Sequence, residues 1–264
     1  MTRKMPDGED TYGGVCAFVH KSLKAKVDMA RSSPDTLVLK IGDMHFINAY
    51  VAGEHSSASR HFADWQAQHP WDTFSVLVRE MSDAGLAFSV HGDLNGRSGA
   101  LCPLGLDHPP RVVDDIVVNG QGRKLVDLCE QNGLQLVNGC TLIPGVHHGF
   151  TFFGRVDTTS EIGKSTVDYV LTSRAAAGRL SRMDIALPRQ DCSDHAATRP
   201  ALQIPSRPTP SFTIAALVNA CSTLVHDSHS HPRHTPSFKF TSLSSTRATL
   251  VNGRALRPRQ RPSP

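Results

Sequence analysis

The chain alternates short β-rich segments with amphipathic helix patterns, and this order constrains its fold more than any other feature. Residues 37–51 (LVLKIGDMHFINAYV) predict two strands joined by a tight turn at Gly42-Asp43, because β-branched and aromatic residues favour strands and Gly-Asp favours turns. A helix pattern follows at residues 71–85, and residues 87–95 (AFSVHGDLN) predict a further strand. Strands and helices mixed in this way predict an α/β layered domain.

Two segments have the periodicity of helices with one buried face. In residues 71–85 the apolar positions recur at i, i+3, i+4 and i+7, and Gly85 marks the end. Residues 120–133 (GQGRKLVDLCEQNG) predict a second helix with Gly133 as its C-cap. The residues predicted to face inward are Phe74, Leu77, Val78 and Met81 in the first helix and Leu125, Leu128 and Cys129 in the second.

Five more segments are rich in strand-forming residues. They are residues 13–20, 134–138, 149–154, 165–173 and 195–204. Residues 97–115 contain Pro and Gly and predict a loop.

The charge of the chain is unevenly distributed. Of the net charge of +4, residues 206–264 carry +7, from eight Lys or Arg and one Asp, which leaves −3 for residues 1–205. The basic segment is rich in Pro, Ser, Thr and Arg and cannot bury enough apolar surface to offset its ordering entropy. We therefore expect one domain at residues 1–205 and a disordered tail at residues 206–264, in which residues 211–225 have the composition of a short helix. The tail either contacts nucleic acid or another acidic surface through its charge or is a solvated extension without function.

Composition argues against several classes of protein. No apolar run approaches the roughly 20 residues of a membrane helix, and the charged start lacks the apolar core of a signal peptide. We therefore expect an intracellular protein, with the nucleus as one candidate location, that is not secreted and has no membrane partner. The six cysteines include no Cys-x-x-Cys pair, so reduced thiols are expected rather than a metal cluster or a disulfide framework.

The segment SVHGDLNGRSG (residues 89–99) places Asp93 and Asn95 at the end of a predicted strand. Asn-Gly is a strong turn signal and Asp favours turns by bonding the nearby backbone, so a plain turn is one interpretation. The other interpretation is a pair of site residues at the end of the strand. His91 shares a strand face with Asp93 and is interpreted as a structural neighbour.

Polar residues also accompany three other predicted strands. Asp168 lies inside the pattern STVDYVLTS, where a carboxylate is costly unless it is paired or exposed. Ser193, Asp194 and His195 stand together just before a strand, and Tyr50 ends another. Each has an ordinary explanation when taken singly: a carboxylate that faces solvent, a turn with a surface histidine, and a half-buried aromatic ring.

The order of these residues is more specific than any one of them. The order resembles that of the endonuclease/exonuclease/phosphatase superfamily: a Tyr at a strand end, then Gly-Asp-x-Asn, the Thr of FTFF, the Asp of DYVL and Ser-Asp-His. The resemblance is closest to the apurinic-site-endonuclease-like endonuclease domains of non-LTR retrotransposons. Three segments carry it: HGDLNG (with Leu94 for the usual Phe), NGQGRKLVDLCEQNGLQLVNG and GFTFFGRVDTTSEIGKSTVDYVLTS. The similarity covers about residues 13–204 and implies a four-layer α/β sandwich of the deoxyribonuclease-like type.

The resemblance implies metal-dependent hydrolysis of a phosphodiester in nucleic acid, with DNA expected rather than RNA and no small-molecule cofactor. His195 would be held by Asp168 and would polarise the phosphate or assist proton transfer. Asp93 and Asn95 would orient the attacking water and the phosphate, and Tyr50 and Thr151 would contact the phosphate or stabilise the site. The residues implied as ligands of Mg²⁺ or Mn²⁺ are Asp93, Asn95 and Asp194.

The chain departs from the family's pattern at its start. Family domains begin with a strand that carries an Asn and continue to a strand with a metal-binding Glu, but only 13 residues precede Gly14. Glu9 and Glu54 lie in turn-like or polar segments, so neither is expected to replace that ligand. We therefore expect a truncated sandwich without its first strands and helix. Three functions stay open: a DNA endonuclease, an inactive remnant or weak nucleic-acid-binding module, and a phosphatase or ribonuclease of the same superfamily.

Overall fold

The chain divides into two compact units, Met1–Leu224 and Val225–Pro264. The computed structural model describes parts of the first unit only, namely residues 3–4, 11–12, 14–53, 68–104, 110–154, 163–186, 194–203 and 214–215. The division into a domain at residues 1–205 and a disordered tail stays a prediction.

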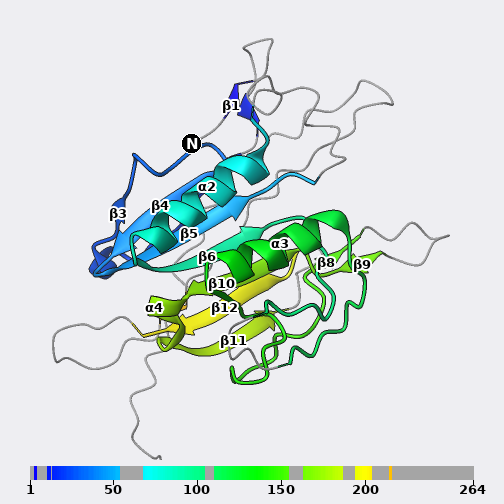
Figure 1. Cartoon of the computed structure of the whole chain (residues 1–264). Coiled ribbons are helices and arrows are strands. Elements are labelled where there is room, and N and C mark those ends of the chain that lie inside the picture. Colours follow the sequence, from blue (N-terminus) through cyan, green and yellow to red (C-terminus); the bar gives the residue numbers. More distant parts are fainter. Residues whose placement is uncertain are drawn as a thin grey trace, which may run out of the picture. The chain divides into compact units, whose positions relative to one another are not determined.

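Six strands form the main sheet of the first unit, in the order β3-β4-β5-β6-β10-β7 (Figure 1). Their bounds are Lys26–Val27 (β3), Thr36–Ile41 (β4), Met44–Tyr50 (β5), Ala87–Asp93 (β6), Asp168–Ser173 (β10) and Leu134–Leu136 (β7). The strands β5 and β6 are parallel, and the other neighbouring pairs are antiparallel. The turn at Gly42-Asp43 lies where the sequence predicted it, between β4 and β5.

Two helices, α2 (Pro70–Asp83) and α3 (Gly120–Gln131), cover one face of this sheet. All seven residues predicted to face inward are buried, and they pack on side chains of the sheet in one core. The helix α3 ends one residue earlier than predicted, because Asn132 is its C-cap and Gly133 follows with φ +62°. A residue with positive φ commonly comes directly after the C-cap rather than at it.

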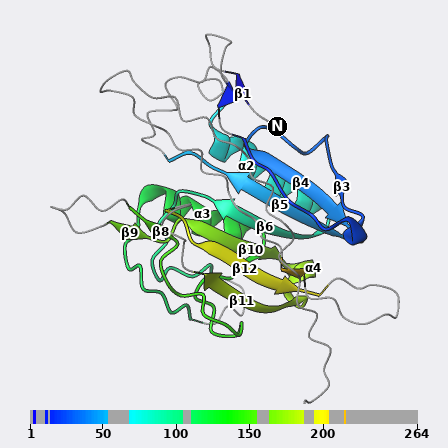
Figure 2. The ribbon, with the colours of Figure 1, turned by 180° about the vertical axis from the view of Figure 1, so that it is seen from behind.

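A smaller sheet packs on the opposite face of the main sheet. Its strands are β11 (Leu180–Ala186), β12 (Ala197–Leu202) and β13 (Ile214–Ala215). Buried residues such as Met183 and Leu202 join those of the main sheet, including Phe46 and Val170, in a second core. Figure 2 shows the ribbons of β11 and β12 from the side away from α2 and α3. The described residues thus form a helix layer, a six-stranded sheet and a three-stranded sheet. This confirms the predicted α/β sandwich, and the described residues supply three of its four predicted layers.

Four short strands and two short helices complete the described part of the unit. They are β1 (Arg3–Lys4) with β2 (Thr11–Tyr12), β8 (Phe152–Phe153) with β9 (Lys164–Ser165), η1 (Lys21–Leu23) and α4 (Arg174–Ala177).

Two predictions of secondary structure are wrong where the structure describes the residues concerned. Residues 14–20 form no strand, although they are rich in strand-forming residues. Ala17 packs on the second core and the carbonyl of Cys16 accepts a side-chain hydrogen bond from Asn48 at 2.9 Å, so this segment lies on the sheet without joining a ladder. Ile214 and Ala215 form a strand beside β12 where a short helix was suggested. Strand propensity mainly records fit to a pleated surface, so it does not predict whether a partner strand is present.

Two expectations from composition can be compared with the described residues. Cys129 and Cys140 are buried free thiols. Within the described ranges, no helix has the length and apolar character that a bilayer crossing needs.

Candidate functional site

Three neighbouring strands bring Tyr50, Asp93 and Asp168 to one end of the main sheet. Because β5 and β6 are parallel, their carboxyl ends meet, and Tyr50 is paired with Asp93. The strand β10 runs antiparallel to β6, and its first residue, Asp168, lies directly opposite Asp93. Residues directly opposite in a ladder point to the same face of the sheet. Asp93 and Asp168 are both buried, so Asp168 is not the solvent-facing carboxylate of its ordinary explanation.

The glycine before Asp93 allows β5 and β6 to approach each other closely. Gly92 has φ +146°, and a Cβ atom at this position would lie 1.9 Å from the carbonyl oxygen of Ala49 on β5. Any larger residue would have to push the two strands apart. The Gly of the motif therefore has a structural reason, because it lets β5 and β6 come this close one residue before Asp93.

His195 joins this end of the sheet from the segment before β12. Its Nδ1 lies 2.9 Å from Oδ2 of Asp168. The ring meets Phe152 edge-on with 5.0 Å between ring centroids, and the two residues also form an isolated antiparallel bridge. The backbone N–H of Phe153 donates to the carbonyl of Asp194 at 2.8 Å. The Ser-Asp-His segment, as far as it is described, is therefore held along β8 with its histidine against Asp168.

The two carboxyls and the imidazole change one another's pKa. Burial lowers the pKa of His195, but the hydrogen bond with Asp168 and the nearby charges of Asp168, Asp93 and Asp194 outweigh it and raise the pKa to about 9. Burial, followed by the charge of Asp168, raises the pKa of Asp93 to about 8, although His195 and Asn95 act in the opposite direction. At neutral pH we therefore expect His195 to be an imidazolium and Asp93 to hold a proton unless a cation lies beside it.

Asn95 serves as a turn residue and lies in the site at the same time. It has φ +50°, and its backbone N–H donates to Oδ1 of Asp93 at 3.0 Å. Its side-chain Nδ2 donates to the carbonyl of Val51 at 3.0 Å, which fixes the orientation of the amide. The turn interpretation and the site interpretation are therefore compatible, because the turn is what places Asn95 beside Asp93.

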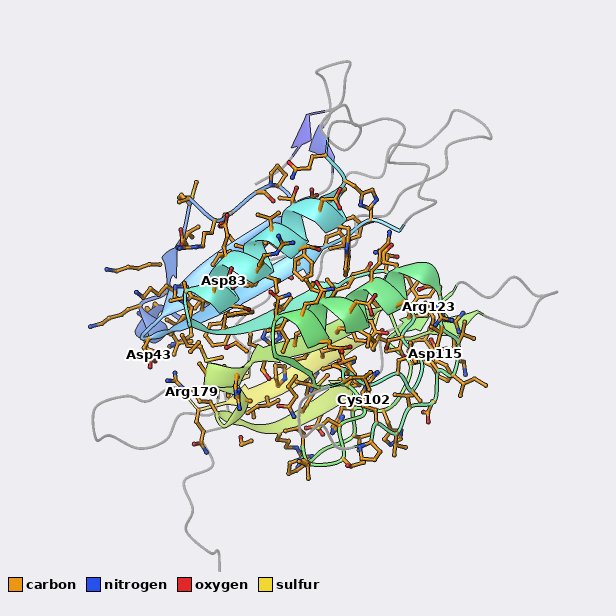
Figure 3. The ribbon with its side chains drawn as sticks, in the orientation of Figure 1. Asp43, Asp83, Cys102, Asp115, Arg123 and Arg179 are labelled. Atoms are coloured by element: carbon orange, nitrogen blue, oxygen red, sulfur yellow. The ribbon has the colours of Figure 1, made fainter. Side chains whose placement is uncertain are left out.

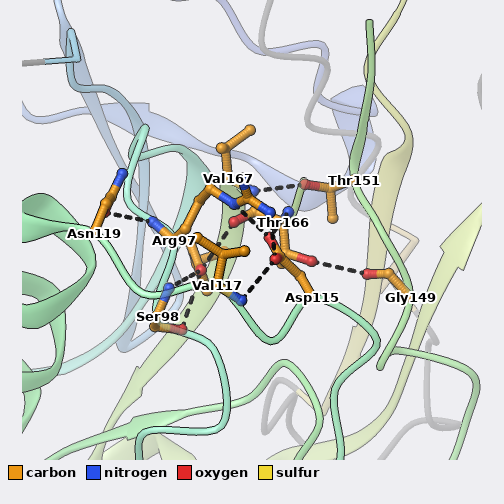
Figure 4. A network of polar contacts seen from close by, with 10 residues as sticks. Arg97, Ser98, Asp115, Val117, Asn119, Gly149, Thr151, Thr166 and Val167 are labelled. Atoms are coloured by element: carbon orange, nitrogen blue, oxygen red, sulfur yellow. Dashed lines mark hydrogen bonds and ion pairs between the residues drawn. The ribbon is translucent and has the colours of Figure 1, made fainter. Parts of the chain in front are cut away.

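Thr151 has a structural position behind the site. Its side chain is completely buried, and Oγ1 accepts hydrogen bonds from the backbone N–H groups of Val167 and Asp168, both at 3.0 Å (Figure 4). Of the two roles that the resemblance implied for Thr151, this geometry matches stabilisation of the site rather than contact with the phosphate.

Two further residues hold the start of β10 and were not identified from the sequence. Asn138 donates from Nδ2 to the carbonyl of Asp168 at 3.0 Å and accepts from the N–H of Val170 at 2.9 Å. Asp115 accepts from the N–H of Thr166 at 2.8 Å. A buried amide placed just after a strand was the only local signal for Asn138, and it is too common to be specific.

His91 lies two residues before Asp93 and is completely buried. Its ring stacks on Phe46 with 6.3 Å between centroids, and neither ring nitrogen has a hydrogen-bond partner among the described residues. Burial lowers the pKa of His91 to about 4, so the ring is neutral at physiological pH.

The side chains near this end of the sheet include oxygen donors of the kind that a hard divalent cation takes. Asp93, Asn95 and Asp194 offer carboxylate and amide oxygens, and Mg²⁺ is commonly held by one or two carboxylates while it keeps several waters. Among the described residues, however, no three His, Cys, Asp or Glu side chains gather as a metal-binding group. Glu9, Glu54 and Ser193 lie outside the described residues.

No model of a known protein family matches this sequence, and no curated protein is similar to it. Solved structures do match. The endonuclease domain of TRAS1, a telomere-specific non-LTR retrotransposon, is 14% identical over 69% of this chain and 68% of that one, with a TM-score of 0.46. The 3'-5' exonuclease NExo from Neisseria meningitidis is 19% identical over 66% of this chain and 67% of its own, with a TM-score of 0.43.

The AP endonuclease LMAP from Leishmania major is 13% identical over 67% of this chain and 61% of its own, with a TM-score of 0.46. All three of these proteins are nucleases. At such identities, function has to be inferred from the side chains of the site.

Proposed function

We propose that this chain is a divalent-metal-dependent phosphodiesterase that cleaves nucleic acid, with DNA as the favoured substrate. The observation that supports this most is the pairing of Asp93 directly opposite Asp168, whose carboxylate also bonds His195 at 2.9 Å. Residues that are far apart in the sequence thus form one polar group at the end of a sheet. Burying such a group costs free energy, and strongly perturbed titratable groups cluster at functional sites.

The chemistry of the three side chains matches hydrolysis of a phosphodiester. This reaction needs an oriented water and positive charge near the non-bridging oxygens. His195, with its pKa raised to about 9, supplies a positive charge and a proton, while Asp168 orients the ring. Asp93 and Asn95 would orient the water. Asp93, Asn95 and Asp194 would hold Mg²⁺ or Mn²⁺, which when bound would neutralise charge on the phosphate oxygens.

DNA is favoured because the motif order resembles the endonuclease domains of retrotransposons more closely than it resembles the other enzymes of the superfamily. Tyr50, which is half-buried and paired with Asp93 at the end of β5, would contact the phosphate.

A second candidate function is an inactive remnant that still binds nucleic acid weakly. It is favoured by the finding that the described residues include no group of three metal-binding side chains. A site with too few ligands would bind Mg²⁺ weakly and lose much of its transition-state stabilisation.

A nicking assay on supercoiled plasmid DNA tests the proposal. The full chain should nick the plasmid in Mg²⁺ and stop when EDTA is added, whereas Asp93→Ala and His195→Ala should reduce the rate by at least about a hundredfold. The proposal is wrong if all three proteins show the same background rate. The remnant is then the better description, and retained binding of the plasmid would support a binding module.

A further inference from the structure

An Arg–Asp pair lies beside the candidate site and has no role in the chemistry described above. Nε of Arg97 donates to Oδ2 of Asp115 at 2.9 Å, and Nη2 donates to Oδ1 at 2.6 Å (Figure 4). Asp115 is buried, whereas Arg97 keeps 30% of its side chain exposed. The third guanidinium nitrogen, Nη1, makes no hydrogen bond with any described residue. One edge of the guanidinium is thus bound to the protein, and the exposed part of the side chain remains available to a ligand.

The pair is close to the site at both of its ends. Arg97 follows Asn95 by two residues, which a chain spans in at most about 7 Å. Asp115 bonds the N–H of Thr166, which precedes Asp168 by two residues. The backbone N–H of Leu94 also donates to the carbonyl of Val167 at 2.9 Å, so the two segments run side by side.

Arg97 is held in place through its backbone as well as its side chain. Its N–H donates at 2.9 Å to Oδ1 of Asn119, the residue that caps α3. Gly122 of α3 packs so closely that a Cβ atom there would lie 1.9 Å from the carbonyl oxygen of Arg97. An arginine fixed in this way loses little side-chain entropy when it binds a ligand.

We propose that Arg97, held by Asp115, binds the phosphate next to the one that is cleaved, so that the site prefers a polynucleotide to an isolated phosphodiester. This inference rests on the proposed function and names its substrate class. A guanidinium presents its donors in one plane and binds phosphate oxygens well, and a nucleic acid strand offers a second phosphate at the neighbouring nucleotide.

The chain contains a matched control pair at the opposite end of the main sheet. Arg179 bonds Asp43 through Nη1 at 2.9 Å and Nη2 at 2.7 Å. Asp43 lies beside Arg179 in the turn before β5 (Figure 3), whereas Tyr50 ends that strand near the site. The two double variants Arg97→Gln/Asp115→Asn and Arg179→Gln/Asp43→Asn each leave the net charge unchanged. General electrostatic attraction to DNA is therefore the same in both proteins.

Two measurements on the full-length variants test the proposal. One is binding of a short DNA duplex in Ca²⁺, followed by fluorescence anisotropy, and the other is hydrolysis of bis(4-nitrophenyl) phosphate in Mg²⁺. The Arg97/Asp115 variant should bind the duplex about tenfold more weakly, since a charged hydrogen bond is lost, and its rate on the small ester should fall by clearly less than tenfold. The Arg179/Asp43 variant should match wild type in both.

The proposal is overturned if duplex binding is unchanged, or if the Arg97/Asp115 variant loses equally on both substrates, because the pair would then only shape the site. If wild type hydrolyses neither the ester nor DNA, the proposed function fails, but the binding comparison still decides the role of Arg97. Thermal melting checks that the variants fold. If the double variant does not fold, Arg97→Lys replaces it, because one ammonium cannot serve Asp115 and a phosphate with the same geometry. Duplex binding by Arg97→Lys equal to wild type would contradict the proposal.

Discussion

Replacement of Asp168 by Asn tests the electrostatics of the site most sharply. The pKa of His195 is about 9, compared with an ordinary value of 6.5, and its hydrogen bond with Asp168 is the strongest of the effects that raise it. The Asn side chain keeps the shape of Asp168 but removes the charge. Burial then lowers the pKa of His195 with only Asp93 and Asp194 to oppose it. We therefore expect the pKa of His195 to fall by two units or more, to about 7 or below.

The same change alters how stability depends on pH. A histidine whose pKa rises on folding contributes stability that is fully present below pH 6.5 and is lost as pH increases through about 9. At 1.36 kcal/mol per unit, this contribution is about 3 kcal/mol for His195 in the metal-free protein. The raised pKa of Asp93 acts in the same direction, because that stability is lost as pH increases through about 8. In Asp168→Asn the contribution of His195 shrinks, so the free energy of unfolding should vary less with pH between 6.5 and 9.

The assay is a titration of histidine ring signals by NMR, together with urea unfolding of the metal-free protein at several pH values. Asp114→Asn serves as the control, because Asp114 is a surface carboxylate that also lies beside a histidine, 3.4 Å from Nδ1 of His148. It should leave the titration of His195 unchanged. A pKa of His195 that stays near 9 in Asp168→Asn would refute the reasoning.

Three further substitutions test the structure around the site. Gly92→Ala should destabilise the protein by about 3 kcal/mol or more in urea unfolding, because its Cβ would meet the carbonyl of Ala49; a loss below about 1 kcal/mol would contradict this close approach. Thr151→Val should lower the free energy of unfolding by about 2–4 kcal/mol, since two buried N–H groups at the start of β10 lose their acceptor. The control Thr141→Val, on the surface, should lower it by less than about 0.5 kcal/mol, and equal losses would contradict the structural role of Thr151. His91→Phe should stabilise the protein by about 1 kcal/mol, because two unpartnered ring nitrogens leave the core. Wild type loses stability as pH falls from 6.5 through about 4, and the variant should lack the part of this loss that is due to His91; an unchanged acid transition would contradict the prediction.

Much of the fold was predictable because it depends on local patterns. The strands β4, β5 and β6 and the helices α2 and α3 follow from periodicity and turn residues within each segment. The strand β11 has no such pattern, since only Leu180 and Met183 are buried and the register shifts between Leu180 and Arg182. Residues 14–20 show the opposite case, in which strand-forming residues find no partner strand.

The candidate site was predictable only as a set of residues, through the order of the motifs. That Asp93 lies opposite Asp168 depends on the register between β6 and β10, which no local pattern contains. Arg97, Asp115 and Asn138 were missed for a related reason. Each acts through a hydrogen bond to a segment distant in sequence, so only the folded structure reveals its position.

The most direct test of the central proposal is whether Asp93 and His195 act as parts of one catalytic site. The rate of plasmid nicking in Mg²⁺ should be measured for Asp93→Ala, His195→Ala and the double variant under the same conditions. Groups that act as a unit are not additive, so we predict that the double variant is no slower than the slower single variant. Losses that multiply in the double variant, or no loss in any variant, would contradict a shared site.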